Sequence, residues 1–146
     1  MSVDVRVLVA DGEAGVRNGL FRALLDRDVF CDCASTAGDA ITRLAERPYS
    51  VVVLDFGLPH AGAAAVIESL RIMTPQNRPI VIALAVGGDH GRDTDTDMVQ
   101  MILRRPIQFG DVADMIDACV AQVRTTWEAA RSAATDRSIR RSGTST

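Results

Sequence analysis

The sequence contains no lysine, and all 16 of its basic residues are arginine. It is also poor in cysteine, with three, and in aromatic residues, which make up 4% of its 146 residues. A small, odd set of cysteines does not support a disulfide-stabilised secreted domain and indicates a reducing compartment. No apolar run approaches the roughly 20 residues that a membrane span needs, and the first residues lack the layout of a signal peptide. We therefore expect a cytoplasmic protein without a membrane segment.

Charge and composition limit the class of protein further. The net charge of −3 argues against nucleic-acid binding by the domain as a whole, although Arg137, Arg140 and Arg141 form a small basic group near the end. A hydrophobic fraction of 47% suits one compact α/β domain. We expect this domain to cover residues 1–124. Residues 125–146 are expected to form a helix extension to about Ala134 and then a disordered Arg/Ser/Thr tail.

Apolar runs typical of buried parallel strands alternate along the chain with segments of helical spacing. The expected strands are residues 3–10, 29–33, 51–55, 79–86 and 101–103, and the expected helices are residues 13–27, 37–47, 61–73 and 111–124. This alternation predicts a doubly wound five-stranded parallel sheet in the order 2-1-3-4-5, with helices on both faces. Residues 87–97 are rich in Gly and Asp, so a helix there is expected to be short, fraying or absent.

Three acidic residues follow two of the predicted strands. Asp11 and Glu13 come after the first strand, and Asp55 ends the third, which is a run of apolar residues broken by Gly57 and Pro59. Neighbouring parallel strands place their carboxyl ends at one crevice, so these acids are expected to share a pocket. Clustered carboxylates favour the binding of a cation such as Mg²⁺. A nucleophilic aspartate among them is what the formation of an aspartyl-phosphate requires.

The chain resembles the receiver domain of two-component response regulators over about residues 4–122. The resemblance is carried by Arg6-Val7-Leu8-Val9-Ala10-Asp11-Gly12-Glu13 with Arg17, by Val53-Leu54-Asp55-Phe56-Gly57-Leu58-Pro59, by Val81-Ile82-Ala83-Leu84-Ala85 and by Leu103-Arg104-Arg105-Pro106. It implies that Asp55 accepts a phosphoryl group from a histidine kinase or phosphotransfer protein. It also implies a Mg²⁺ site at Asp11, Asp55 and Gly57, and a cis bond between Arg105 and Pro106.

Several positions depart from that family's pattern. Gly12 replaces an acid that binds Mg²⁺, so we expect weak or absent metal binding, with Glu13 as a partial substitute. Ala85 stands where a Thr or Ser hydroxyl is usual, and Arg105 stands where a Lys is usual. Arg105 can form a standing ion pair with Asp55, which would make Asp55 a structural strand-end acid. The Asp-Gly expected after the acceptor loop appears as Gly62-Ala63, and the aromatic switch position is Ile102.

Two functions remain open at this point. One is a phosphorylatable signalling receiver, with no enzyme activity beyond weak self-phosphorylation and dephosphorylation at Asp55. The other is a pseudo-receiver that acts through protein–protein contacts alone. An FMN-binding protein fits poorly, because the first loop lacks a Ser/Thr/Gly-rich phosphate cradle. Trp127 follows the core stripe of the last helix, so residues 114–131 are expected to bind a downstream protein or a second copy, unless Trp127 folds back on its own domain.

Overall fold

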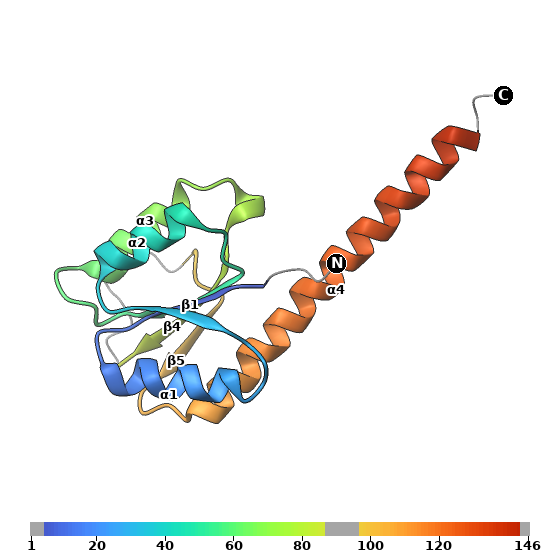
Figure 1. The fold of residues 1–146 in the computed structure, drawn as a ribbon. Helices are drawn as coiled ribbons and strands as arrows, with labels where there is room; N and C mark the ends of the chain where they lie inside the picture. Colours follow the sequence, from blue (N-terminus) through green and yellow to red (C-terminus); the bar gives the residue numbers. More distant parts are fainter. Residues whose placement is uncertain (1–4, 87–96, 144–146) are drawn as a thin grey trace.

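Five parallel strands form one sheet in the order β2-β1-β3-β4-β5 (Figure 1), which confirms the predicted topology. The strands are β1 (Val7–Ala10), β2 (Cys31–Ala34), β3 (Val51–Asp55), β4 (Ile80–Ala85) and β5 (Met101–Arg104). The structure is a computed structural model that describes residues 5–86 and 97–143, and residues 136–143 by their backbone alone. Most of residues 87–97, where we expected a helix to be short, fraying or absent, therefore lies outside the described residues.

The central strand, β3, is buried along its whole length. It pairs in parallel with β1 on one side and β4 on the other, so that Ala10 lies beside Leu54 and Leu84 lies beside Asp55. Its β-branched residues suit a position between two covered faces, where both sides of the strand meet apolar side chains. This placement carries Asp55 to the carboxyl edge of the sheet.

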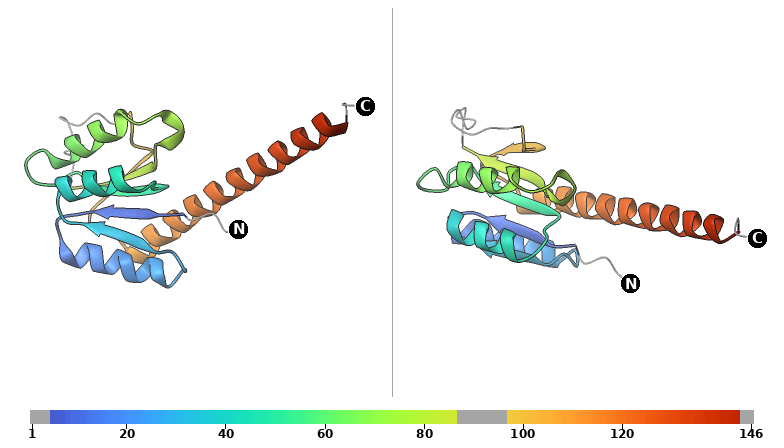
Figure 2. Two further views of the ribbon diagram at one scale, coloured as in Figure 1. Left: turned by 45° about the horizontal axis from the view of Figure 1, so that its top comes forward. Right: turned by 90° about the horizontal axis from the view of Figure 1, so that it is seen from above.

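Helices cover both faces of the sheet, as the left view of Figure 2 shows. On one face α1 (Ala14–Leu25) and the start of α4 (Phe109–Gly143) pack around Val9, Val53 and Leu84. On the other face α2 (Ala37–Glu46) and α3 (Gly62–Arg71) pack around Leu8, Leu54 and Val81. A short 3₁₀ turn, η1 (Pro75–Asn77), leads into β4. Each helix buries an apolar stripe against the sheet, which α4 does only over its first turns.

The last helix is longer than the sequence predicted. A single helix, α4, runs for 35 residues and leaves the domain as a free rod (Figures 1 and 2). We expected it to start at Asp111 and to give way to a disordered tail after about Ala134. Residues 125–142 contain neither Gly nor Pro, and alanine and arginine favour helix, so no residue there stops the helix before Gly143. Across the described residues, no helix is both long and apolar enough to cross a membrane.

Candidate functional site

Asp11 and Asp55 lie side by side at the carboxyl edge of the sheet. Asp11 directly follows β1 and is fully buried, and Asp55 ends the neighbouring strand β3 and is 7% exposed. They are the buried charged residues of the described chain. Two unpaired carboxylates at this depth would be costly, because burial penalises each charge and the two charges repel.

Arg105 supplies the cation that this pair requires. It directly follows β5, and its guanidinium Nη2 donates to Asp11 Oδ2 and lies 3.2 Å from Asp55 Oδ1. The side chain of Arg105 is 15% exposed, so this ion pair is largely withdrawn from water. The structure thus contains the expected ion pair between Arg105 and Asp55. The contact between Arg105 and Asp11 was not predicted.

Backbone N–H groups hold both carboxylates in place. The N–H of Gly57 donates to Asp55 Oδ1 at 2.8 Å, and the N–H of Gly12 lies 3.5 Å from Asp55 Oδ2. The N–H of Glu13 donates to Asp11 Oδ1 at 2.9 Å. A Cβ at Gly57 would lie 3.1 Å from Asp55 Oδ1, so glycine lets the loop close over the carboxylate. Asp11 therefore has one oxygen bonded to the backbone and the other facing Arg105, whereas Oδ1 of Asp55 both accepts from the backbone and faces Arg105.

Burial and the charges of the site shift the pKa values of Asp11 and Arg105. Burial raises the pKa of Asp11, and the nearby charge of Asp55 adds to that, against the N–H of Glu13 and the guanidinium of Arg105, which act to lower it. Burial alone would lower the pKa of Arg105. The hydrogen bond from Arg105 to Asp11 and the charges of Asp11 and Asp55 outweigh burial and raise it. Arg105 therefore stays charged, whereas burial makes the ionised form of Asp11 less favourable.

Three other predicted positions surround the pair. Ala85 ends β4 and is buried, and its carbonyl accepts a 2.8 Å hydrogen bond from the N–H of Arg105. Glu13 stands at the N-cap position of α1, where its exposed side chain makes no capping hydrogen bond. Ile102 on the edge strand β5 is 37% exposed. The bond between Arg105 and Pro106 is cis, as expected.

The residues present fit a tightly held Mg²⁺ poorly. Among the described residues, no three His, Cys, Asp or Glu side chains come together as a metal site, so Glu13 does not complete a set with Asp11 and Asp55. Gly12 contributes only its N–H, which a cation does not bind. The guanidinium of Arg105 already provides a cation beside both carboxylates. The chemistry that remains is a buried, preorganised carboxylate pair under an arginine.

Solved structures share this fold and strand order. A receiver domain (CheY-like) from Methanospirillum hungatei JF-1 superposes with a TM-score of 0.72 at 20% identity, covering 82% of this chain and 97% of that one. A receiver domain from Clostridium thermocellum gives 0.70 at 19% identity, covering 84% and 99%. This chain has the receiver-domain fold. A structure described as an adenylate cyclase from Rhodopirellula baltica also matches, with a TM-score of 0.71 at 22% identity over 88% of this chain and 98% of that one.

Sequence similarity extends to one curated regulator. The chain is 32% identical over 81 residues to the transcriptional regulatory protein PmrA of Pectobacterium parmentieri. The match covers 56% of this chain and 36% of that regulator, so the chain spans little more than a third of its relative's length. No protein-family model matches the sequence.

The meeting of Asp11 and Asp55 could be predicted from the sequence, whereas the contact between Arg105 and Asp11 could not. Strand ends predicted which carboxylates meet, because the alternation of strands and helices sets the sheet order. The contact between Arg105 and Asp11 depends on how far an arginine reaches across two strand ends, which residue spacing does not encode. A charge balance could have indicated it, since two buried acids require more than one ion pair with Asp55 alone.

Proposed function

We propose that this chain is a receiver-type signalling domain of a two-component phosphorelay, with Asp55 as its candidate phosphoacceptor at a degenerate metal and switch site. The observation that carries the proposal is the placement of Asp55 beside Asp11 at the carboxyl edge of a receiver-type sheet, beneath the cation of Arg105. A histidine kinase or phosphotransfer protein is the corresponding donor. A downstream protein is the corresponding partner, and the cytoplasm is the compartment where both would be met.

Phosphorylation of Asp55 would be a single displacement at phosphorus. A carboxylate oxygen of Asp55 attacks the phosphorus of a phosphohistidine or an acyl phosphate, a new P–O bond forms, and the bond to the leaving group breaks. Arg105 is a cation beside Asp55, where negative charge would accumulate on the phosphoryl oxygens in the transition state. Its guanidinium must turn from the Asp55 carboxylate to the incoming phosphoryl oxygens, so transfer is expected to be slow.

A second candidate is a pseudo-receiver that signals through protein contacts without phosphorylation. One specific observation favours it: Arg105 bridges both carboxylates in a largely buried ion pair, so each acid has a cationic partner without a bound metal ion. Ala85 is consistent with this reading, because it has no hydroxyl to bond a phosphoryl oxygen and couple it to the following loop.

Metal and phosphate titrations distinguish these two functions. We expect weak Mg²⁺ binding, slow or absent labelling of Asp55 by acetyl phosphate, and few amide shifts with beryllofluoride, because a metal ligand and a hydroxyl are missing at residues 12 and 85. The measurements are amide NMR spectra during each titration and mass spectrometry of the labelled peptide. Tight Mg²⁺ binding with stoichiometric labelling of Asp55 would rule out the pseudo-receiver.

A second experiment restores the carboxylate missing at residue 12 and the hydroxyl missing at residue 85. A Cβ at Gly12 would meet no atom within 4 Å, so Gly12→Asp fits without displacing its neighbours. We expect Gly12→Asp to raise Mg²⁺ affinity on the order of tenfold or more, and Gly12→Asp with Ala85→Thr to recover part of the labelling. Gly38→Asp adds the same charge at an equally open position on α2 and is the matched control. Asp55 that stays unlabelled even in the restored double variant contradicts the phosphoacceptor role.

A further inference from the structure

Two of the three cysteines lie on one strand and face the same side of the sheet. Cys31 and Cys33 are two residues apart in β2, where successive side chains point to opposite faces. Both belong to the apolar layer under α1. Asp32 between them points to the other face, where it accepts a hydrogen bond from the hydroxyl of Tyr49. Because both cysteines are free thiols, β2 presents two neighbouring thiols to α1.

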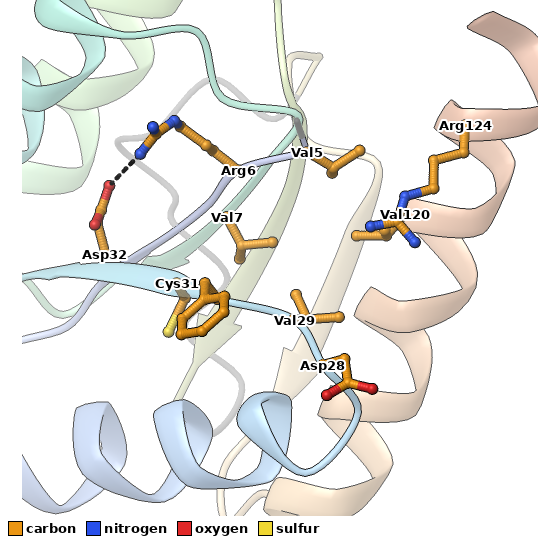
Figure 3. A pocket seen from close by; sticks show the side chains of 10 residues that line it. Val5, Arg6, Val7, Asp28, Val29, Cys31, Asp32, Val120 and Arg124 are labelled. Carbon is orange, nitrogen blue, oxygen red and sulfur yellow. Dashed lines mark ion pairs between the residues drawn. The ribbon is translucent and has the colours of Figure 1, made fainter. Parts of the chain in front are cut away.

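The two thiols differ in their access to solvent. Cys31 is 7% exposed and forms part of the wall of a pocket of about 380 Å³ at the amino-terminal edge of the sheet, beside Val29 and Val120 (Figure 3). Cys33 lies two residues nearer the carboxyl edge and is half-buried. It also belongs to an edge strand, which has no neighbouring strand on its outer side. Cys33 is therefore the more accessible thiol of the two.

Two arginines act on Cys33, one from the helix on each side of the sheet. Arg17 of α1 donates to the backbone carbonyl of Asp11 at 2.8 Å, which holds its guanidinium near the carboxyl ends of β1 and β2. Arg43 belongs to α2 on the other face. The positive charges of Arg17 and Arg43 favour the thiolate of Cys33, and the negative charge of Asp32 opposes it. A half-buried thiol near arginine is an environment in which a reactive thiolate forms.

The thiol of Cys31 stabilises the same negative charge. A hydrogen bond with Cys31 lowers the pKa of Cys33 to about 7; burial opposes this shift, and the charges of Arg17 and Arg43 add to it. The pKa of Cys31 is raised in turn, because it donates that bond and is itself buried. Near neutral pH the pair therefore carries one proton on Cys31 and one negative charge on Cys33.

We propose that Cys33 is a modification site that undergoes thiol–disulfide exchange with low-molecular-weight disulfides, with Cys31 as the hydrogen-bond donor that activates it. The thiolate sulfur of Cys33 attacks one sulfur of the disulfide, and a new S–S bond forms. The S–S bond of the reagent breaks, and the departing sulfur takes its electron pair and then a proton from water. Cys33 is thereby oxidised to a mixed disulfide, and the other half of the reagent is reduced to a thiol.

The geometry of β2 opposes a disulfide between the two cysteines themselves. At about 3.3 Å per residue, the Cα atoms of Cys31 and Cys33 lie roughly 6.6 Å apart, near the upper limit of about 6.8 Å for a disulfide. Side chains on one face of a strand also stand roughly parallel, so the Cβ atoms do not point toward each other. The expected product is therefore an adduct on Cys33 that leaves Cys31 as a thiol.

Alkylation and disulfide exchange on the intact chain test the proposal. The rate of alkylation of Cys33 by iodoacetamide, followed by peptide mass spectrometry, should rise with a midpoint near pH 7 in the folded chain and near about 8.5 in urea. With oxidised glutathione at pH 7, Cys33 should gain one adduct before Cys31 or Cys119 gains any. A folded midpoint of about 8.5 or above, or earlier reaction at Cys119, contradicts the proposal. An internal disulfide, seen as the loss of two hydrogens without an adduct, contradicts the proposed product.

Variants separate the activating role of Cys31 from its packing. Cys31→Ala removes the donor and should move the midpoint of Cys33 toward about 8.5, whereas Cys31→Ser keeps a donor and should retain a lower midpoint. Arg17→Gln should also raise the midpoint. Arg22→Gln removes the same charge from an exposed position of α1 and is the matched control. An unchanged midpoint in Cys31→Ala overturns the role of Cys31. These readouts do not involve Asp55, so their failure leaves the proposed signalling function in place.

Discussion

Arg105 is the shared cationic partner of two buried carboxylates, so its loss should cost more than the loss of either acid. Arg105→Ala would leave Asp11 and Asp55 buried without a cation, and breaking a buried pair in this way costs about 3–5 kcal/mol. Asp55→Asn keeps the pair between Arg105 and Asp11 and removes a repulsion, so we expect its free energy of unfolding to lie within about 1 kcal/mol of the unsubstituted chain. Urea denaturation measures both.

The double variant tests whether the two residues act together. If Arg105 is needed because of the carboxylates, Arg105→Ala combined with Asp55→Asn should be more stable than Arg105→Ala alone, because one uncompensated charge is gone. Equal stability of the single and double variants would show that Arg105 stabilises the fold by packing. In that case the ion pair would not explain the site.

Tyr49 links the turn after α2 to the edge strand β2. Its hydroxyl donates a 2.6 Å hydrogen bond to Asp32, and burial together with that bond raises the pKa of Tyr49 to about 12. The folded protein therefore holds the phenol proton more tightly than the unfolded chain does, whose tyrosine titrates near about 10. This contribution to stability is complete below about pH 10 and is lost as the pH rises toward 12.

The composition simplifies the optical measurement of this pH dependence. The chain has one tyrosine, so the phenolate absorbance reports on Tyr49 alone, although burial also raises the pKa of the Cys119 thiol. We expect the ultraviolet absorbance of the phenolate to appear with a midpoint near 12, and the free energy of unfolding to fall between about pH 10 and 12. Tyr49→Phe should remove that slope. A midpoint near 10 in the folded protein would show that the bond to Asp32 is not maintained.

At the scale of elements, the contact of α1 with α4 depends on a missing side chain. A Cβ at Gly19 of α1 would lie 2.3 Å from the ring of Phe109, at the start of α4. Gly19→Ala should therefore push the ring aside and cost about 1–3 kcal/mol, despite the better helix propensity of alanine. Gly15 lies on the same helix with nothing within 4 Å, so Gly15→Ala should be neutral or stabilising. Thermal unfolding of both variants decides this.

The same scale shows what the sequence could predict. Strand and helix positions followed from periodicity, and Thr36, whose side chain accepts from the N–H of Asp39, is a residue type that favours the N-cap of a helix such as α2. The end of α4 was less predictable than these positions, because a polar segment rich in Arg, Ser and Thr is compatible with both a helix and a disordered tail. The absence of Gly and Pro before Gly143 was the overlooked signal.

At the scale of the molecule, the pair of Asp11 and Asp55 and the exposed part of α4 beyond Val120 lie at opposite edges of the sheet. Arg105 directly follows β5 at the carboxyl edge, and α4 then crosses back (Figure 1) and leaves beside a pocket lined by Val5, Val29 and Val120 (Figure 3). Sequence reasoning placed Asp11 and Asp55 at one edge because parallel strands all end there. The pocket was not predicted, since it depends on the angle at which α4 departs.

The free length of α4 also determines how the protein moves through solution. At about 1.5 Å per residue, residues 121–143 of the helix are ~34 Å long, whereas a compact domain of about 100 residues has a radius of gyration of ~13 Å. A rod attached to a small body experiences more friction than a sphere of equal mass. A single chain should therefore diffuse slowly and elute early from a sizing column, at a position that a globular standard would assign to a larger particle.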